Sequence, residues 1–320
     1  RSEATLAGPL TELIAAQDAG LSPDDVLVSA GAAGALFIIS TSLLSEHDHL
    51  VVVRPNYATN IETPRAIGCD ISFIDLSFDN GFALDLAKVA AALRPNTRYI
   101  SVTCPHNPTG TAMSRADLDG LIGLAERHGC HLLVDETYRD LSYGEKLPAA
   151  ASLSPRAISV SSLSKAFGIP GIRIGWLVTR DAKLYERFLA AKEQIGICGS
   201  VIDEAVARKM LEGRDAFLQQ LVPQMAARRD IVQAWIDAEP LVDWVRPHGG
   251  VVGFPRLNIG EDFDLERFHQ RLLERHGAYV GPGHWFEMPK SFFRLGFGWP
   301  TEDQLKGGLA AISAALREQF

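Results

Sequence analysis

Between residues 24 and 180, short apolar runs rich in β-branched residues alternate with longer stretches of helical character. The runs have mostly apolar centres without a strict polar alternation, which indicates strands covered on both faces. Such strands, separated by helices, form a mainly parallel sheet with helices packed on both sides. The expected strands are 25–30, 49–55, 70–76, 98–105, 130–137, 157–164 and 173–179, and the expected helices are 32–44, 84–93 and 114–128.

The chain changes character after residue 180. Residues 181–238 are mostly helical, and Pro223 is expected to start or kink a helix because proline lacks a backbone hydrogen-bond donor. The expected fold class is α/β, with a large domain over residues 1–222 and a smaller C-terminal α+β domain over residues 223–320. In the smaller domain short strands alternate with helices, at 251–257, 264–276, 292–298 and 302–317.

Composition and charge exclude several classes of function. A chain of 320 residues with 47% hydrophobic and 22% charged residues is typical of a soluble globular protein. Its net charge of -8, without a basic block, argues against binding to nucleic acid or to an anionic membrane surface. No metal site is predicted. The cysteines form no C-x-x-C pair, which favours a reduced cytoplasmic setting; they are Cys69, Cys104, Cys130 and Cys198.

Residues 26–45 carry no charge over about the length of a membrane-spanning helix. Gly, Ala, Ser and Thr make up more than half of this stretch, however, and Gly31 interrupts it. We therefore expect a strand, a turn and a helix rather than a membrane span. If the helix begins here, the free N–H groups of Ala32 and Ala33 form an anion site. Small residues at such a junction can equally serve tight packing alone.

One lysine, Lys165, stands among small and apolar residues in the segment 159–176, between two expected strands. Burial would lower the pKa of its amine by penalising the charged form, and a neutral amine forms Schiff bases with aldehydes. Ser162 and Arg173 are close enough in sequence to hold one phosphate with a hydroxyl and a guanidinium. The structural alternative is a lysine at a strand end whose ammonium reaches solvent.

Asp135 lies in the apolar run 130–137, where an unpaired carboxylate would be costly. A pyridinium nitrogen would compensate it; the alternative is an aspartate that caps a helix. Asn107 and Tyr138 each follow an expected strand and could donate hydrogen bonds to a phenolate-type oxygen, while Tyr57 could stack on a flat ring. Taken alone, Asn107 fits a plain turn and Tyr57 an ordinary aromatic residue at a rim.

These residues occur in the order and approximate spacing of one known family. The chain resembles the pyridoxal-phosphate-dependent aminotransferases of fold type I, class I/II, over essentially its whole length. The resemblance rests on Gly31-Ala32-Ala33, Tyr57 and the segments "HNPTG", "DETY", "SLSKAFGIPGIRIGW" and "FRLGFG". It implies pyridoxal 5'-phosphate as cofactor and a cytoplasmic homodimer as the active form.

The resemblance also assigns roles to individual positions. Lys165 corresponds to the catalytic Schiff-base lysine, Asp135 to the carboxylate on the pyridine nitrogen, and Arg294 to the arginine that binds the substrate α-carboxylate. In this family an aromatic residue stacks on the cofactor ring, and its position corresponds to Tyr57. Two residues donate hydrogen bonds to the ring oxygen, and their positions correspond to Asn107 and Tyr138. Of these, Asn107 also borders the substrate and Tyr138 is counted as catalytic. The phosphate cradle corresponds to Ala32, Ala33, Ser162 and Arg173.

The resemblance implies an enzyme that moves an amino group between an α-amino acid and a 2-keto acid through the Lys165 Schiff base, in ping-pong fashion. Other reactions at the same cofactor (lyase, decarboxylase, cyclase or oxidase) and the body of a transcriptional regulator stay open as alternatives. No second arginine is identified for a dicarboxylate side chain, so an aspartate-type substrate is not expected. The family further implies residues before Arg1, in an arm that crosses to the partner subunit and closes the substrate pocket.

Overall fold

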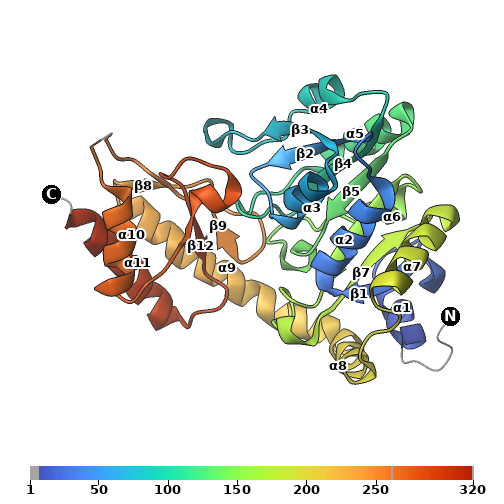
Figure 1. Ribbon diagram of the computed structural model, residues 1–320. Coiled ribbons are helices and arrows are strands. Elements are labelled where there is room, and N and C mark those ends of the chain that lie inside the picture. Colours follow the sequence, from blue (N-terminus) through green and yellow to red (C-terminus); the bar gives the residue numbers. More distant parts are fainter. Residues whose placement is uncertain (1–6, 261, 319–320) are drawn as a thin grey trace.

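The computed structural model describes residues 7–260 and 262–318 (Figure 1). Its centre is a seven-stranded sheet with the order β1-β7-β6-β5-β4-β2-β3. Each strand lies within two residues of a range expected from the sequence, and the bounds are β1 (Val26–Ala30), β2 (His49–Arg54), β3 (Asp70–Asp75), β4 (Thr97–Thr103), β5 (His131–Asp135), β6 (Ala157–Ser162) and β7 (Ile174–Thr179).

The sheet is mainly parallel, which confirms the expected fold class. Strands β2 to β6 pair in parallel throughout. Strand β7 is antiparallel to both of its neighbours, β6 and β1. Because β7 reverses the direction twice, β1 again runs the same way as β6, and its carboxyl end returns to the edge where the parallel strands end.

Helices cover both faces of the sheet. One face packs against α2 (Gly31–Leu43), α3 (Thr59–Ile67) and α7 (Ala182–Ile195). The other face packs against α4 (Leu86–Ala92) and α5 (Arg115–His128) beside β2 to β5, and against α1 (Ala7–Ala15) and α8 (Val201–Glu212) beside β1 and β7. A short helix, α6 (Ala150–Leu153), contacts β6.

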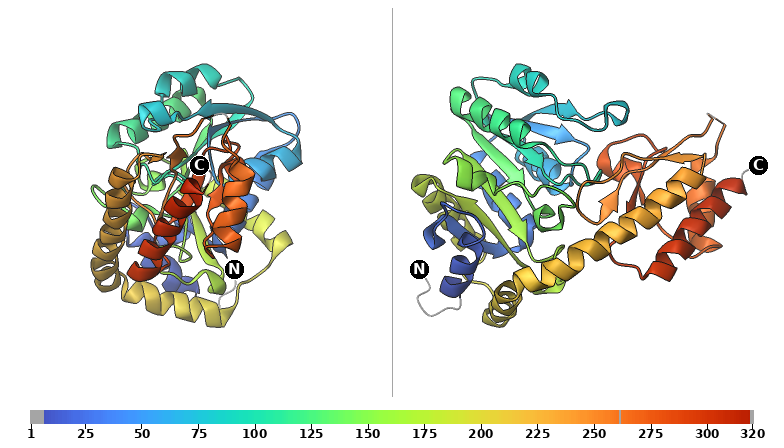
Figure 2. Two further views of the ribbon diagram at one scale, coloured as in Figure 1. Left: turned by 90° about the vertical axis from the view of Figure 1, so that its left-hand side faces the viewer. Right: turned by 180° about the vertical axis from the view of Figure 1, so that it is seen from behind.

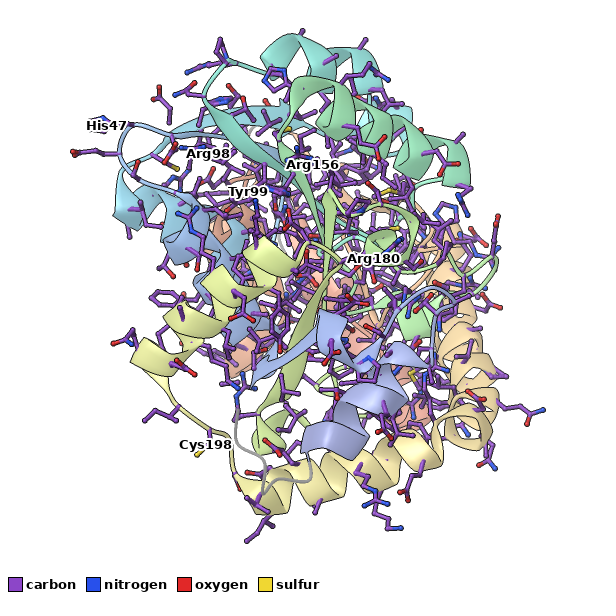
Figure 3. All side chains as sticks on the ribbon, turned by 90° about the vertical axis from the view of Figure 1, so that its right-hand side faces the viewer. His47, Arg98, Tyr99, Arg156, Arg180 and Cys198 are labelled. Carbon is purple, nitrogen blue, oxygen red and sulfur yellow. The ribbon has the colours of Figure 1, made fainter. Side chains whose placement is uncertain are left out.

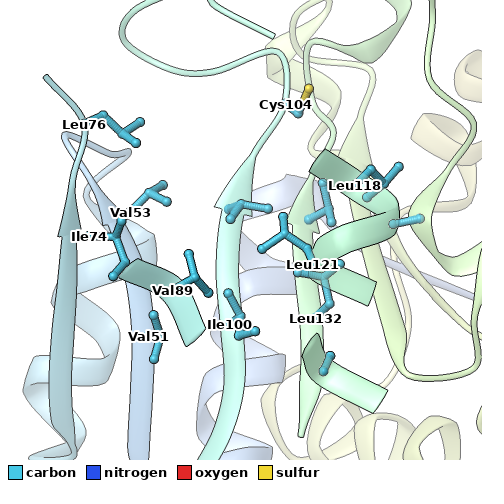
Figure 4. Close-up of a cluster of buried hydrophobic side chains, with 14 of the residues drawn as sticks. Val51, Val53, Ile74, Leu76, Val89, Ile100, Cys104, Leu118, Leu121 and Leu132 are labelled. Atoms are coloured by element: carbon cyan, nitrogen blue, oxygen red, sulfur yellow. The ribbon is translucent and has the colours of Figure 1, made fainter. Parts of the chain in front are cut away.

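Alternate residues of each strand enter different cores, as expected for strands buried on both faces. Val51 of β2 packs with Val89 of α4 and Leu121 of α5, whereas its neighbour Val52 belongs to the core on the α2 side. Figure 4 shows the first of these cores, with strand side chains facing α4 and α5. The two cores fix each strand by both faces, so the residues at the strand ends are held rigidly.

The uncharged stretch 26–45 forms β1 followed by α2, as the strand–turn–helix interpretation predicted. Eight residues of α2 are buried against the sheet and neighbouring helices. Within residues 7–260 and 262–318, no helix has both the length and the apolar character that crossing a membrane requires.

The C-terminal part lies beside the sheet and is joined to it by one long helix, α9 (Arg214–Ala238) (Figures 1 and 2). It has a core of its own, built around Phe268, Phe293 and Phe297. Its helices are α10 (Leu265–Glu274) and α11 (Glu302–Arg317), and its strands are β8 (Val242–Asp243), β9 (Val252–Gly253), β10 (Arg256–Leu257), β11 (Gly281–Pro282) and β12 (Phe293–Gly296).

Pro223 lies inside α9 and does not start a helix. The proposed boundary between residues 222 and 223 therefore falls within the connecting helix, and the division into two domains stays a prediction. The expected strand 251–257 is two short strands in different sheets, β9 and β10. Helix α3 was not indicated by the sequence pattern because it is largely polar and contains Pro64, a combination typical of a loop. Helix α1 was not indicated either.

Candidate active site

Five chain segments that carry candidate residues meet at one edge of the sheet. Strands β2, β4, β5 and β6 are parallel, so the segments that follow Arg54, Thr103, Asp135 and Ser162 emerge at the same edge. The antiparallel strand β7 begins there, and its first residue pairs with Ala30, after which α2 starts. Ligands of open α/β sheets bind at this edge because loops and helix N-termini converge on it.

All ten sequence-predicted residues line a single cavity of about 240 Å³ at this edge: Ala32, Ala33, Tyr57, Asn107, Asp135, Tyr138, Ser162, Lys165, Arg173 and Arg294. Nine of them come from the sheet part of the chain. The tenth, Arg294, lies on β12 of the C-terminal part, so the cavity is closed by both parts of the molecule.

One end of the cavity can hold an anion. The hydroxyl of Ser162 and the guanidinium of Arg173 reach it, together with the first turn of α2, whose leading N–H groups have no partner within the helix. Arg173 has left-handed backbone (φ 54°) and donates hydrogen bonds to the carbonyls of Pro170 and Ala30, at 2.9 and 3.3 Å. These contacts hold the guanidinium over the β1–α2 turn.

Two glycines make this close approach possible. A Cβ atom at Gly175 would stand 2.4 Å from the carbonyl carbon of Gly31 and 2.6 Å from the nitrogen of Ala32. A Cβ atom at Gly31, where φ is 73°, would stand 2.5 Å from Nη2 of Arg173. The anion end is therefore a cradle that side chains at these positions would fill.

Asp135 supplies a carboxylate deeper in the cavity, at the end of β5. It is 4% exposed, and its Oδ1 accepts hydrogen bonds from the backbone N and the Oγ1 of Thr137, at 3.1 and 2.5 Å. Burial raises the pKa of Asp135, although hydrogen bonds from Thr137 and Asn60 and the charge of Lys165 oppose the rise. A cation placed against this carboxylate would lower its free energy.

Lys165 follows β6 and faces the same cavity. Its side chain is exposed, so the expectation of a buried lysine is wrong, and Lys165 lines the cavity. Desolvation and then the charge of Arg294 lower the pKa of the Lys165 amine, while Asp135 raises it. Among the described residues, Nζ takes part in no hydrogen bond or ion pair. The amine is free to react with a bound molecule.

The same cavity is lined by Arg294, which is half-buried. Its Nη1 lies 3.4 Å from Oδ1 of Asn107, and its guanidinium carbon lies 5.0 Å from the ring centre of Phe286. Tyr138 is buried, which raises its pKa to about 12 and keeps its hydroxyl a donor. Tyr57 is 37% exposed at the rim, so a flat ligand could lie against it.

Four further residues line the cavity that were not expected from the sequence: Thr103, Thr137, Ser164 and Pro170. Asn60, which hydrogen-bonds to Asp135 from α3, was not expected either. Thr103 could have been found, because it ends β4 and is paired in register with Asp135. Asn60 could not, because α3 carries no helical sequence signal.

A second cavity, of about 360 Å³, lies on the neighbouring face. It is larger but mostly apolar, with residues of β1, α2 and the α7–α8 connection around it. Lys192 lines it, but among the described residues no buried carboxylate does. Arg173 lines both cavities. Figure 3 shows Cys198 of the α7–α8 connection at the edge of the molecule. Nearby apolar side chains are strongly exposed, including Ile197 (79%) and Ile202 (77%).

Comparison with known proteins gives the same family for nearly the whole chain. The family model "Aminotransferase class I and II" matches residues 10–312. Capreomycidine synthase of Streptomyces vinaceus is 32% identical over 91% of this chain and 74% of its own length. Arginine–pyruvate transaminase AruH of Pseudomonas aeruginosa is 30% identical over 92% of this chain and 72% of its own.

Solved structures agree with this result. A PLP-dependent aminotransferase from Streptococcus suis superimposes with a TM-score of 0.92 at 30% identity, over 98% of this chain and 82% of the other. The seven-stranded sheet, its helical layers and the smaller C-terminal part are therefore those of this fold. The chain belongs to the class I and II aminotransferases, the pyridoxal-phosphate-dependent family of fold type I.

Proposed function

We propose that this protein is an aminotransferase that moves an amino group between an α-amino acid and a 2-keto acid. The observation that supports the proposal is that one cavity is lined by Lys165, Asp135 and Arg294 together with the residues of the anion cradle. A cofactor phosphate fits the cradle, and a substrate carboxylate fits the guanidinium of Arg294. The reacting atoms would then lie between them, within reach of the amine.

The residues present fit pyridoxal 5'-phosphate. When bound, this cofactor supplies an aldehyde and a pyridine ring that accepts electrons from the substrate Cα. Asp135, whose charge is under-compensated in the protein alone, would hold the proton on the ring nitrogen. Tyr57 would cover one face of the ring, and Asn107 and Tyr138 would donate hydrogen bonds to its oxygen. The cradle of α2, Ser162 and Arg173 would hold the phosphate through backbone N–H groups, a hydroxyl and a guanidinium.

Lys165 would carry the proton transfer. Because its pKa is lowered, a larger share of the amine is neutral and able to take a proton from the substrate Cα. The same group, once protonated, would return the proton as a general acid. Arg294 fixes the α-carboxylate and so orients the Cα–H bond toward Lys165. With pyridoxal phosphate as the carrier of the amino group, the first keto acid would leave before the second one binds, which predicts ping-pong kinetics.

Replacing Lys165 with alanine tests the proposal. The variant should lose the visible absorbance of the covalently attached cofactor and all turnover, while Lys192→Ala, a lysine beside the other cavity, should retain both. A panel of amino donors that includes L-arginine would be scored by the mass of the keto product. Full turnover of Lys165→Ala would contradict the assigned role.

A second candidate is another reaction at Cα of an amino acid bound to the same cofactor. The relative at 32% identity is named a synthase rather than a transaminase, and Lys165, Asp135 and Arg294 would serve either chemistry. Single-turnover product analysis separates the two. Transamination leaves the amine form of the cofactor and a keto acid, whereas a lyase, cyclase or decarboxylase returns the cofactor to its starting form.

A second copy of this chain is the proposed partner. An apolar patch beside the larger cavity consists of Phe37, Ile195, Ile197, Val201, Ile202 and Val206, all of them exposed. Exposed apolar clusters of this kind mark interfaces. The patch is continuous with the cradle through Arg173, so a homodimer would cover the phosphate end of the site. The four free cysteines support a cytoplasmic location.

A further inference from the structure

Glu287 lies at a junction between the C-terminal part and the sheet. It follows the 3-10 turn η5 (Gly283–Phe286) and has left-handed backbone, with φ 57° and ψ 31°. Residues with a Cβ atom avoid this conformation because it brings the Cβ close to a carbonyl oxygen. Here the side chain of Glu287 compensates through contacts that a glycine could not make.

The carboxylate of Glu287 joins two arginines of the sheet part. Its Oε1 forms an ion pair with Nη1 of Arg65 on α3, and its Oε2 lies 3.4 Å from Nη1 of Arg54 at the end of β2. Both guanidinium groups also lie over the ring of Phe73, with their carbons 4.7 and 5.6 Å from its centre. Figure 1 shows β2 and α3 on the side of the sheet part that faces the C-terminal part.

The residues on both sides of this contact are close along the chain to residues that belong to, or touch, the proposed site. On the sheet side, Arg54 precedes Tyr57 by three residues, and Arg65 belongs to the helix that follows Tyr57. On the other side, Glu287 follows Phe286, whose ring lies against the guanidinium of Arg294. Phe286 is 5% exposed and packs edge-on against Phe254, so it transmits the position of η5 to the cavity.

We propose that Glu287 is a positioning residue that sets the separation between Tyr57, which covers the cofactor ring, and Arg294, which binds the substrate carboxylate. The inference rests on the proposed function, because it assigns Arg294 to the carboxylate. Glu287 itself does not line the cavity. It acts through Phe286 on one side and through the β2–α3 segment on the other.

The two arginines that contact Glu287 favour an ionised carboxylate there. The hydrogen bond from Arg65 contributes most to lowering the pKa of Glu287, and Arg54 adds to it. The other acids in the cluster, Asp75 and Glu62, pair with these same arginines. The contact therefore persists at neutral pH, and salt is the variable that weakens it, because half-exposed ion pairs are screened.

Hydrogen exchange of the cofactor-free protein tests the contact without relying on activity. In Glu287→Gln and in Arg65→Met, amides of residues 283–294 should exchange about threefold faster, because the turn is released from α3. Peptides from residues 159–176 should exchange as in the unaltered protein. Asp119→Asn breaks a comparable surface ion pair, with Arg115 on α5, and serves as the matched control with no change in either segment.

Kinetics of the loaded enzyme test the consequence for the site. With L-alanine and L-arginine as amino donors, Glu287→Gln should raise KM about fivefold with kcat changed less than twofold, as for loss of one ion pair in a network. Cofactor affinity should change less than KM does. The double variant with Arg65→Met should have a KM no higher than that of either single variant. Added salt should raise KM more in the unaltered enzyme than in the variants.

Two results would overturn the proposal. One is that the amides of residues 283–294 exchange at the unaltered rate in both Glu287→Gln and Arg65→Met. The other is that these amides exchange faster while KM stays unchanged. Glu287→Gly separates charge from backbone strain, since glycine favours the left-handed conformation and lacks the carboxylate. It should raise KM as Glu287→Gln does; an unaltered KM would show that the backbone alone positions Arg294. If neither amino acid reacts with the unaltered enzyme, the proposed function is at fault, and the exchange measurement decides the role of Glu287.

Discussion

Replacing Asp135 with asparagine should change the stability of this protein in opposite directions without and with the cofactor. The carboxylate is 4% exposed, and its Oδ1 accepts two hydrogen bonds from Thr137. Asparagine keeps an oxygen in that place, so the substitution removes the charge and retains the acceptor. The effect is therefore mainly electrostatic.

Without the cofactor, the substitution should stabilise the fold. Burial raises the pKa of Asp135 above its ordinary 3.8 and outweighs the hydrogen bonds and the charge of Lys165. A carboxyl group of this kind contributes stability below its unfolded pKa that is lost as the pH rises through its folded pKa. Removing the buried charge should raise the free energy of unfolding by about 1–2 kcal/mol near neutral pH, and by less toward pH 4.

In the presence of the cofactor, the substitution should lower both cofactor affinity and turnover. A pyridinium nitrogen about 4 Å from the carboxylate gains about 4 kcal/mol at an effective dielectric constant of 20. This energy corresponds to about three pKa units at the ring nitrogen. In Asp135→Asn the ring should lose its proton near neutral pH, the cofactor should bind less tightly, and kcat should fall by about 10³-fold.

Urea unfolding with and without pyridoxal phosphate, at a mildly acidic and a mildly alkaline pH, measures both effects in one experiment. Asp237→Asn, an exposed carboxylate on α9 that accepts a hydrogen bond from Gln233, is the matched control and should change neither stability nor turnover. An Asp135→Asn protein that is less stable without cofactor, yet keeps its turnover, would refute the electrostatic reasoning.

Three further predictions concern other parts of the molecule. Burial raises the pKa of Glu136 from 4.5 to about 7. The protonated side chain therefore stabilises the fold below pH 4.5, and this contribution is lost as the pH rises through about 7. Glu136→Gln should abolish this pH dependence, so that above pH 7 its free energy of unfolding, measured in urea, exceeds that of the unaltered protein by up to about 3 kcal/mol. Equal free energies of unfolding above pH 7 would contradict the prediction. Gly175→Ala forces a Cβ atom against Gly31 and Ala32. It should lower the free energy of unfolding by about 1–3 kcal/mol and weaken cofactor binding, measured by fluorescence titration. Unchanged binding would show that the cradle can accommodate the extra methyl group. Ile202→Glu should yield monomers in light scattering with lower cofactor affinity, and a dimer of unaltered mass would place the interface elsewhere.

Much of the fold could be predicted from the sequence because its strands are buried on both faces. Continuous apolar runs such as 49–55 and 130–137 mark these strands directly, and each corresponds to a strand of the structure. The same runs place Asp135 at a strand end. The polar helix α3 could not be found, since its stability comes from the surfaces it packs against and leaves no apolar stripe in its own sequence.

The sequence alone determined the strand and helix pattern, the family resemblance and the candidate residues, because these depend on residue type and local spacing. Only the tertiary structure decided that Arg294 meets Asn107, that Lys165 faces a cavity rather than a closed core, and that Glu287 bridges Arg54 and Arg65. Contacts of this kind depend on how distant segments pack. A sheet edge brings together residues that are more than a hundred positions apart, and no local pattern encodes those distances.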